Sequence, residues 1–406
     1  MPGPLSHIRV LDLSRVLAGP WAAQNLADLG AEVIKVERPG TGDDTRAWGP
    51  PYIKDAHGND TPEAAYYSSV NRNKKSVTLD IGKPEGQAII RELAAKCDVL
   101  IENYKLGTLK RYGLGYEDLK ATNPRLIYCS VTGFGQDGPY APRPGYDFIF
   151  QGMGGLMSIT GERDDAGGGP QKVGVPIIDL MTGMYTSTAV LAALARRDQT
   201  GEGDYIDVGM LDVQVAVLSN QAMNFLMSGK TPKRQGNAHP NIQPQNVFRC
   251  RDGDLILVVG NDAQFARFAE AVGHPEWAKD ERFALNSARV ANQMQLNPLI
   301  NEALSHNDRA YWIARIEDAG VPCGSINAIP EVFEDPQVKS RQMLKKLPHP
   351  TAEAGEVPTL SNPLRFASGA LTYRGAPPTL GQHTAEILGE LGMSAELEAL
   401  RAKGAI

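Results

Sequence analysis

Cysteine is scarce in this sequence and never occurs in closely spaced pairs. The chain of 406 residues contains only Cys97, Cys129, Cys250 and Cys323. Without a CxxC pair or histidines at HExxH spacing, it offers no familiar metal-ligand pattern and no disulfide framework. We therefore expect buried free thiols in a reducing, cytoplasmic compartment, and no metal site.

Long apolar runs and an excess of basic residues are also missing. The longest apolar segment, 180–195, is rich in Thr, Ser and Gly and falls short of the roughly 18 to 20 apolar residues of a membrane span. The net charge of -6 argues against a nucleic-acid-binding surface. The first residues show no cationic region followed by an apolar run, so we expect no secretory signal. Neither nucleic acid nor a membrane is an expected partner.

The glycines of a dinucleotide-binding loop are absent as well. After the first predicted strand, the segment 14–20 (SRVLAGP) has one glycine where the fingerprint needs three, and its proline lacks a donor N–H. Only Glu37, at the spacing of a ribose-binding acid, keeps a NAD-dependent oxidoreductase as an alternative.

What the sequence does contain is a regular alternation of apolar runs and helical spacing. Strands are predicted at 8–13, 32–36, 76–81, 98–101, 126–131 and 205–210. Helices are predicted at 21–29, 84–96, 180–197 and 212–227. Such alternation is typical of an α/β fold, here an open Rossmann-like parallel sheet covered on both faces.

Composition suggests two domains. Residues 228–245 are polar and contain proline, as linkers do, and a smaller α+β domain is predicted at 246–330. The proline-rich return segment lies within 331–406. We expect a large domain built from both chain ends, 1–227 and the C-terminal part of 331–406.

Asp179 is the candidate catalytic residue. It leaves an apolar run where a helix begins. It could be the N-cap of that helix, accepting its N–H groups. Alternatively it is a partly desolvated carboxylate nucleophile, kept ionised by the same dipoles. Periodicity does not decide between the two.

Basic residues gather near the ends of the early predicted strands. They include Arg38, Arg72, Lys74, Lys75, Lys105, Lys110 and Arg111. Ligands of open α/β sheets bind beyond the carboxyl ends of the strands, so cations converging there would suit a phosphorylated ligand. Solvated surface charge is the other interpretation.

Several ordered segments resemble the class III CoA transferases, the family of formyl-CoA transferase and carnitine CoA-transferase, over nearly the whole chain. The segments are 15–20, 31–40, 71–76, 102–104, 133–138, 145–147, 174–183 and 381–384. Residues 40–51 and 66–67 resemble the branch that uses succinyl-CoA and dicarboxylates such as glutarate or hydroxymethylglutarate.

The resemblance implies a mechanism. Asp179 would attack the acyl-CoA thioester to give an acyl-aspartyl anhydride, then take CoA as an aspartyl-CoA thioester and pass it to an acceptor acid through a second anhydride. CoA and acyl-CoA would be substrates, with no tightly bound cofactor, and the family forms interlocked homodimers.

The resemblance also implies binding residues. CoA contacts fall on Val16, Arg38, Lys75, Asn103, Tyr104 and Arg111. Substrate contacts fall on Trp48, Tyr146 and a lid loop containing Gly260 and Asn261. We expect the cation of Arg72 to bind the distal carboxylate of a dicarboxylate. The alternative is that Arg72 is exposed on the surface.

The α-methylacyl-CoA racemases, which are isomerases, remain an alternative. They share the aspartate at position 179 but carry a Gly-His-Asp motif where this chain has Gly145-Tyr146-Asp147. A tyrosine with a pKa near 10 is poorly matched to proton exchange at neutral pH.

Overall fold

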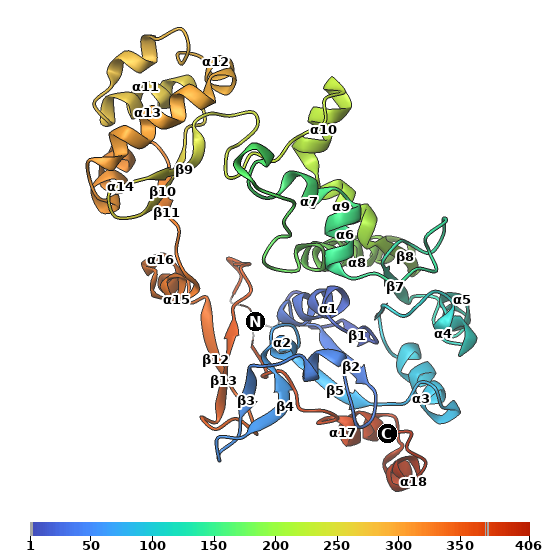
Figure 1. Ribbon diagram of the computed structural model, residues 1–406. Coiled ribbons are helices and arrows are strands. Elements are labelled where there is room, and N and C mark those ends of the chain that lie inside the picture. The colour runs from blue at the N-terminus through green and yellow to red at the C-terminus, as the bar shows by residue number, and fades with distance from the viewer. Residues whose placement is uncertain (1–2, 370, 372) are drawn as a thin grey trace. The chain divides into compact units, whose positions relative to one another are not determined.

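The computed structural model describes residues 3–369, 371 and 373–406, and their contacts divide the chain into two units (Figure 1). The first unit combines the chain up to Gly155 with Gly174–Ala222 and Pro336–Ile406. The second unit combines Leu156–Val173 with Met223–Asp335. Residues 156–173 thus pack with the second unit, whereas we expected them in the large domain.

The first unit is built on a six-stranded, wholly parallel sheet, as the alternation predicted. Its strands are β1 (Arg9–Asp12), β2 (Glu32–Glu37), β5 (Lys74–Thr78), β6 (Val99–Glu102), β7 (Ile127–Thr132) and β8 (Asp204–Gly209). The spatial order is β5-β2-β1-β6-β7-β8. The chain adds strands on one side of β1 first and then, from β6 onward, on its other side, as in doubly wound dinucleotide-type sheets. The loops after β1 and β6 therefore diverge and leave a crevice at the carboxyl edge.

Alternating side chains of these strands fill two cores. Val10 and Ile101 pack on one face, while Leu11 and Leu100 pack on the other. The first face is covered by α1 (Ala18–Asp28), α8 (Ile177–Thr200) and α9 (Met210–Val217). The second is covered by α3 (Pro84–Ala95), α5 (Tyr116–Lys120), α17 (Thr384–Glu390) and α18 (Leu397–Ala402). Figure 1 shows α17, in red, near the blue N-terminal strands, where it contacts β5.

The helix α8 contains the apolar segment noted above. By length and composition it would also qualify as a membrane span, but half of its most apolar window is buried within the unit. It packs on α1 and β7. A core helix passes the same test, so this property is weak evidence for a membrane.

Several elements of the first unit were not predicted. Two hairpins occur, β3 (Tyr52–Lys54) with β4 (Asp60–Ala64) and β12 (Leu344–Pro348) with β13 (Glu356–Leu360). The short α6 (Asp147–Met153) was missed. The helix expected at 212–227 is interrupted at Ser219 (φ 46°) and forms α9 and α10 (Ser219–Ser228). The remaining short elements are η1 (Asp44–Ala47), α2 (Ala65–Ser68), α4 (Thr108–Arg111), α16 (Pro336–Ser340) and η4 (Ser394–Glu396).

The second unit is α+β. Its antiparallel sheet has the order β11-β10-β9, with strands β9 (Gln245–Arg249), β10 (Asp254–Val258) and β11 (Cys323–Ser325). Its helices are α7 (Leu156–Ile159), η2 (Asp164–Ala166), α11 (Asp262–Ala271), η3 (Pro275–Lys279), α12 (Asn286–Ala291), α13 (Gln293–Ser305), α14 (Arg309–Asp318) and α15 (Ile329–Glu334). Aromatic side chains, among them Phe248, Phe265 and Trp312, fill its core.

Candidate active site

Two clefts open at the carboxyl edge of the parallel sheet. The Asp179 cleft, about 170 Å³, is lined by the loops after β1, β6 and β7 and by Asp179. The Arg38 cleft, about 400 Å³, is lined by the loops after β2 and β5. Arg15 and Tyr104 line both clefts, so the two meet where the strand order reverses. This is where an open α/β sheet binds its ligand.

Asp179 lies in the first turn of α8 and is only 9% exposed. The interpretation that it is the N-cap is wrong, because Pro176 occupies that position. Instead Asp147, the first residue of α6, caps α8: its Oδ1 accepts the N–H of Ile178 at 2.7 Å and that of Asp179 at 3.3 Å. The carboxylate of Asp179 therefore does not cap its own helix.

The surroundings of Asp179 hold it close to its protonation midpoint at neutral pH. Burial, together with the negative charge of Asp147, raises the pKa of Asp179 to about 7, although the backbone N–H of Ala18 opposes this by hydrogen-bonding the carboxylate. A desolvated carboxylate is poorly stabilised by solvent, so it is a better nucleophile than one in water.

The loop after β1 is held in a strained conformation. Val16 has φ 71°, a region that β-branched residues rarely adopt and that costs about 1–3 kcal/mol. Its N–H donates to Asp43 Oδ1 at 3.3 Å. Asn103, after β6, clamps the preceding residue by accepting the N–H of Arg15 at 2.9 Å and donating to its carbonyl at 2.7 Å. The predicted CoA contacts Val16 and Asn103 thus line one cleft.

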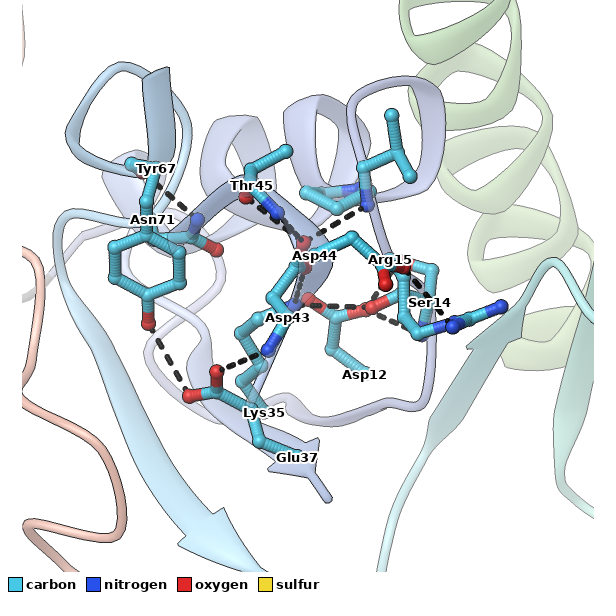
Figure 2. Close-up of polar contacts among 12 residues, drawn as sticks. Asp12, Ser14, Arg15, Lys35, Glu37, Asp43, Asp44, Thr45, Tyr67 and Asn71 are labelled. Carbon is cyan, nitrogen blue, oxygen red and sulfur yellow. Dashed lines mark hydrogen bonds and ion pairs between the residues drawn. The ribbon is translucent and has the colours of Figure 1, made fainter. Parts of the chain in front are cut away.

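A buried ionic network supports this loop from below (Figure 2). Lys35 of β2, fully buried, donates to Asp43 at 2.8 Å and to the carbonyl of Ser14 at 2.9 Å. Burial opposes ionisation of Asp43, yet Lys35 and Thr45 lower its pKa to about 2. Lys74 neutralises Asp12 at 3.0 Å in the same network, where burial lowers the pKa of Lys74 to about 8. These contacts fix the backbone between the two clefts.

The Arg38 cleft contains one predicted cation and three residues that sequence reasoning missed. Arg38 follows β2 and is exposed at the cleft. Residues 80–82, just beyond β5, line the opposite wall. The strand predicted at 76–81 included Asp80 and Ile81, whereas β5 ends at Thr78 and leaves both residues in the loop at the cleft. Arg111 does not line either cleft; its guanidinium lies 5.1 Å from the ring centroid of Tyr112, which does line the Arg38 cleft.

Trp48 and Tyr66 form an aromatic pair, and neither residue lines the Asp179 cleft. Their rings meet edge to face at 5.3 Å. Burial and, to a smaller extent, the carboxylates of Asp179, Asp147 and Asp43 raise the pKa of Tyr66 to about 12. Trp48 was predicted as a substrate contact, whereas Tyr66 was named only as part of the resembling sequence.

The segment before α6 forms the outer wall of the Asp179 cleft. Tyr146, predicted as a substrate contact, lines the cleft and is 61% exposed. Arg143 lines it as well and was not singled out from the sequence. Tyr146 occupies the position of the racemase histidine, so the described cleft offers no imidazole there.

The roles predicted for Arg72 and Lys75 are wrong for the positions that these residues occupy. Arg72 is neither exposed nor in a cleft: it is 3% exposed and pairs with both oxygens of Asp28, at 3.0 and 2.5 Å. Lys75 lies at the amino end of β5, the edge opposite the clefts, where it pairs with Glu32 at 2.7 Å and Glu386 at 2.8 Å. The expected convergence of cations therefore fails here, because Arg72 and Lys75 precede or begin the strand rather than follow it.

Gly260 and Asn261 belong to the second unit. Asn261 is the N-cap of α11 and accepts the N–H of Gln264 at 2.9 Å, while the N–H of Gly260 donates to the Gln264 side chain at 2.7 Å. Their part in covering a substrate stays a prediction. Among the residues described, no group of His, Cys, Asp or Glu side chains is arranged to hold a metal ion.

Comparison with known proteins places this geometry in context. The family model of CoA-transferase family III matches residues 5–384. Succinate–glutarate CoA-transferase of Agrobacterium fabrum is 52% identical over 390 residues, 96% of this chain and 96% of that protein. Human succinyl-CoA:glutarate CoA-transferase is 44% identical over 388 residues, 96% of this chain and 86% of that protein. The crystal structure of a CAIB/BAIF family protein from Brucella suis has a TM-score of 0.83 at 50% identity, covering 96% of this chain and 100% of that one.

Proposed function

Since the chain belongs to CoA-transferase family III and is a CoA-transferase, we propose that it moves CoA from succinyl-CoA to a small dicarboxylate such as glutarate, with Asp179 as the covalent carrier. The observation that supports this most is the buried Asp179 carboxylate, left uncommitted by the Asp147 cap and facing a cleft. The names of the relatives support the choice of donor and acceptor.

The first half-reaction attaches CoA to the enzyme. An oxygen of Asp179 attacks the thioester carbonyl, the C–S bond breaks, and an acyl-aspartyl anhydride and CoA thiolate result. The thiolate then attacks the Asp179 carbonyl of the anhydride, which releases succinate and leaves an aspartyl-CoA thioester. Splitting the transfer in this way replaces one difficult step by easier ones.

The second half-reaction reverses these steps with the acceptor. A carboxylate of glutarate attacks the aspartyl-CoA thioester, giving a second anhydride and CoA thiolate. The thiolate attacks the glutaryl carbonyl of that anhydride, which forms glutaryl-CoA and regenerates the Asp179 carboxylate. No water enters, so the site must exclude it. A lid containing Gly260 and Asn261 would serve this purpose.

The joined clefts suit a bound CoA. Its nucleotide would occupy the larger Arg38 cleft, where Arg38 would lie by the adenine. Its pantetheine arm would pass Tyr104 and Asn103 toward Asp179. Arg111 would reach a phosphate from the rim of the Arg38 cleft. Of the predicted CoA contacts, Lys75 and Arg111 line neither cleft, and Lys75 lies at the opposite edge of the sheet.

We further propose a homodimer. The first unit exposes large apolar side chains on α6, α8 and α9, three helices that contact one another. Its exposed side chains are Phe148, Ile149, Met153, Met184, Tyr185 and Val215. Exposed apolar side chains gathered on neighbouring helices are typical of interaction sites.

Replacing the nucleophile tests the proposed function. Asp179→Ala should lower CoA transfer from succinyl-CoA to glutarate at least about a thousandfold, because the covalent route is lost. CoA binding, measured by calorimetry, should change only a few fold. Asp198→Ala, an exposed aspartate in the last turn of the same helix, is the matched control and should retain activity.

Trapping the intermediate makes the test specific. Hydroxylamine should convert Asp179 to a hydroxamate, detected by peptide mass spectrometry, only when succinyl-CoA is present. Activity near wild type in Asp179→Ala would place the nucleophile elsewhere. Exchange of the α-proton of a 2-methylacyl-CoA in deuterated water without any acceptor acid would instead favour the racemase.

A further inference from the structure

Three cations line the Asp179 cleft, and among them Arg15 alone forms an ion pair with a residue that the structure describes. Arg15 pairs with Asp44 at 3.0 Å and stands where the two clefts meet, on the path proposed for the pantetheine arm. Lys105 lies on the exposed loop after β6 and borders a neighbouring pocket as well. Arg143 forms no ion pair with any residue that the structure describes, although it lines the same cleft as Asp179.

The guanidinium of Arg143 is oriented by aromatic rings. Its central carbon lies 4.6 Å from the ring centroid of Tyr140 and 5.3 Å from that of Phe134. Contacts of this kind with aromatic rings do not use the N–H donors in hydrogen bonds, which leaves these donors available to a ligand. An arginine held in this way can receive a carboxylate through two parallel hydrogen bonds.

The aromatic support is anchored in the core. Phe134 packs edge to face on Tyr140 at 5.6 Å and on Phe150 at 5.2 Å. Phe150 belongs to α6 and is fully buried. Arg143 itself lies between Pro142 and Pro144, which restrict its backbone, and its N–H donates to the carbonyl of Tyr140 at 2.8 Å. The cation is therefore exposed yet held in place.

The same helix connects this cation to the nucleophile. α6 begins with Asp147, whose carboxylate caps the helix that carries Asp179. Phe150, one turn later, supports the rings beneath Arg143. One short element thus fixes both the reacting carboxylate and a free cation in one cleft.

We propose that Arg143 binds the carboxylate of the substrate that does not react, and so selects dicarboxylic over monocarboxylic acyl groups. The inference rests on the proposed function. Succinyl-CoA and glutarate each carry one such distal carboxylate, so Arg143 serves both half-reactions in turn. It takes the role that the sequence suggested for Arg72, whose guanidinium is instead occupied by Asp28.

The test compares acids that differ only at the distal end. Arg143→Ala, Arg143→Lys and the wild type are assayed with glutarate and with pentanoate as acceptors, and with succinyl-CoA and butyryl-CoA as donors. Arg143→Ala should lower kcat/KM for glutarate and succinyl-CoA roughly 10- to 100-fold, the effect of losing a charged hydrogen-bond pair. For pentanoate and butyryl-CoA the change should stay within about twofold, and Arg143→Lys should restore part of the loss.

Controls separate this role from others. Arg196→Ala removes an exposed arginine on α8 that pairs with Asp204, and it should leave both classes of substrate unaffected. CoA binding by Arg143→Ala, measured by calorimetry, should equal that of the wild type, and thermal melting should confirm its fold.

Three outcomes would overturn the inference. Equal losses for dicarboxylic and monocarboxylic substrates would show that Arg143 does not read the distal end. Loss of CoA affinity would assign it to a phosphate of CoA instead. A wild-type enzyme that transfers CoA to monocarboxylates but to no dicarboxylate would refute the proposed acceptor class itself, before any variant is considered.

Discussion

At the scale of the residue, Asp147 acts on Asp179 in two ways. Its carboxylate accepts the first N–H groups of α8, and its negative charge adds to burial in raising the pKa of Asp179. The side chain of Gln151 donates to the other oxygen of Asp147 at 2.5 Å and holds it in place. Asp147 is therefore a positioning residue that also raises the pKa of the proposed nucleophile.

This arrangement predicts the pH dependence of the first half-reaction. Only ionised Asp179 is nucleophilic, so the rate should rise as pH increases through about 7 and level off above it. Asp147→Asn keeps an oxygen to cap α8 but removes the charge, so the pKa of Asp179 should fall and the rising limb should move to lower pH. Single-turnover formation of the aspartyl-CoA thioester, followed from pH 5 to 9, measures both.

The control for this prediction is Asp198→Asn, the same chemical change at the exposed far end of α8. It should leave the profile in place. If Asp147→Asn lowered the rate equally at every pH without moving the limb, Asp147 would act through geometry alone.

At the scale of the element, the two loops that line the clefts depend on one buried lysine. Lys35 ties β2 to the segment 43–47 through Asp43, and to the loop after β1 through the carbonyl of Ser14 (Figure 2). Asp43 in turn accepts the N–H of Val16, whose backbone conformation is strained. Removing one partner of a buried ion pair leaves the other charge without compensation, which is far more damaging than losing a surface pair.

Lys35→Met should therefore destabilise the protein by about 3–5 kcal/mol. It should also weaken CoA binding, because Asp43 would no longer be fixed beneath Val16. Urea unfolding gives the stability, and calorimetry gives the affinity. Lys96→Met, at an exposed helix end, is the control and should stay within about 0.5 kcal/mol.

The stability that Asp43 contributes also has a defined pH range. Its pKa is lowered to about 2 in the folded protein, so this stability is present above the ordinary carboxyl range and is lost as pH falls toward 2.

A Lys35→Met protein as stable as the wild type at neutral pH would show that the ion pair gives no net stabilisation.

At the scale of the whole molecule, the apolar surface on α6, α8 and α9 predicts association. Light scattering after size exclusion should give twice the mass of one chain. Phe148→Glu combined with Met184→Glu should shift the protein toward monomer or aggregate, because each change places a charge in a surface that we propose is buried between subunits. Phe148→Leu keeps the surface apolar and should stay dimeric. A monomeric wild type would contradict the proposal.

The assembly prediction bears on activity as well. If the second subunit is needed to cover the clefts, the Phe148→Glu/Met184→Glu variant should lose transfer activity when it becomes monomeric. If activity persists in a monomer, the clefts of a single chain are sufficient.

The sequence by itself determined the sheet and the family. Short continuous apolar runs indicate strands buried on both faces, and their alternation with helical segments indicates a parallel sheet covered by helices. Asp179 was identified because an apolar run ends in a carboxylate within a matching motif. Elements with little periodicity, such as the seven-residue α6, gave no comparable signal.

The tertiary structure decided which charges are available. The sequence does not show whether Arg72 or Arg143 is available to a substrate. In the structure Arg72 forms an ion pair with Asp28. Arg143 contacts aromatic rings, and no residue that the structure describes accepts a hydrogen bond from its guanidinium. Likewise, Asp179 could have been a cap, and it is not one because Asp147 of another helix takes that role. Pairing of charges depends on residues distant in the chain, and local sequence does not encode which of them meet.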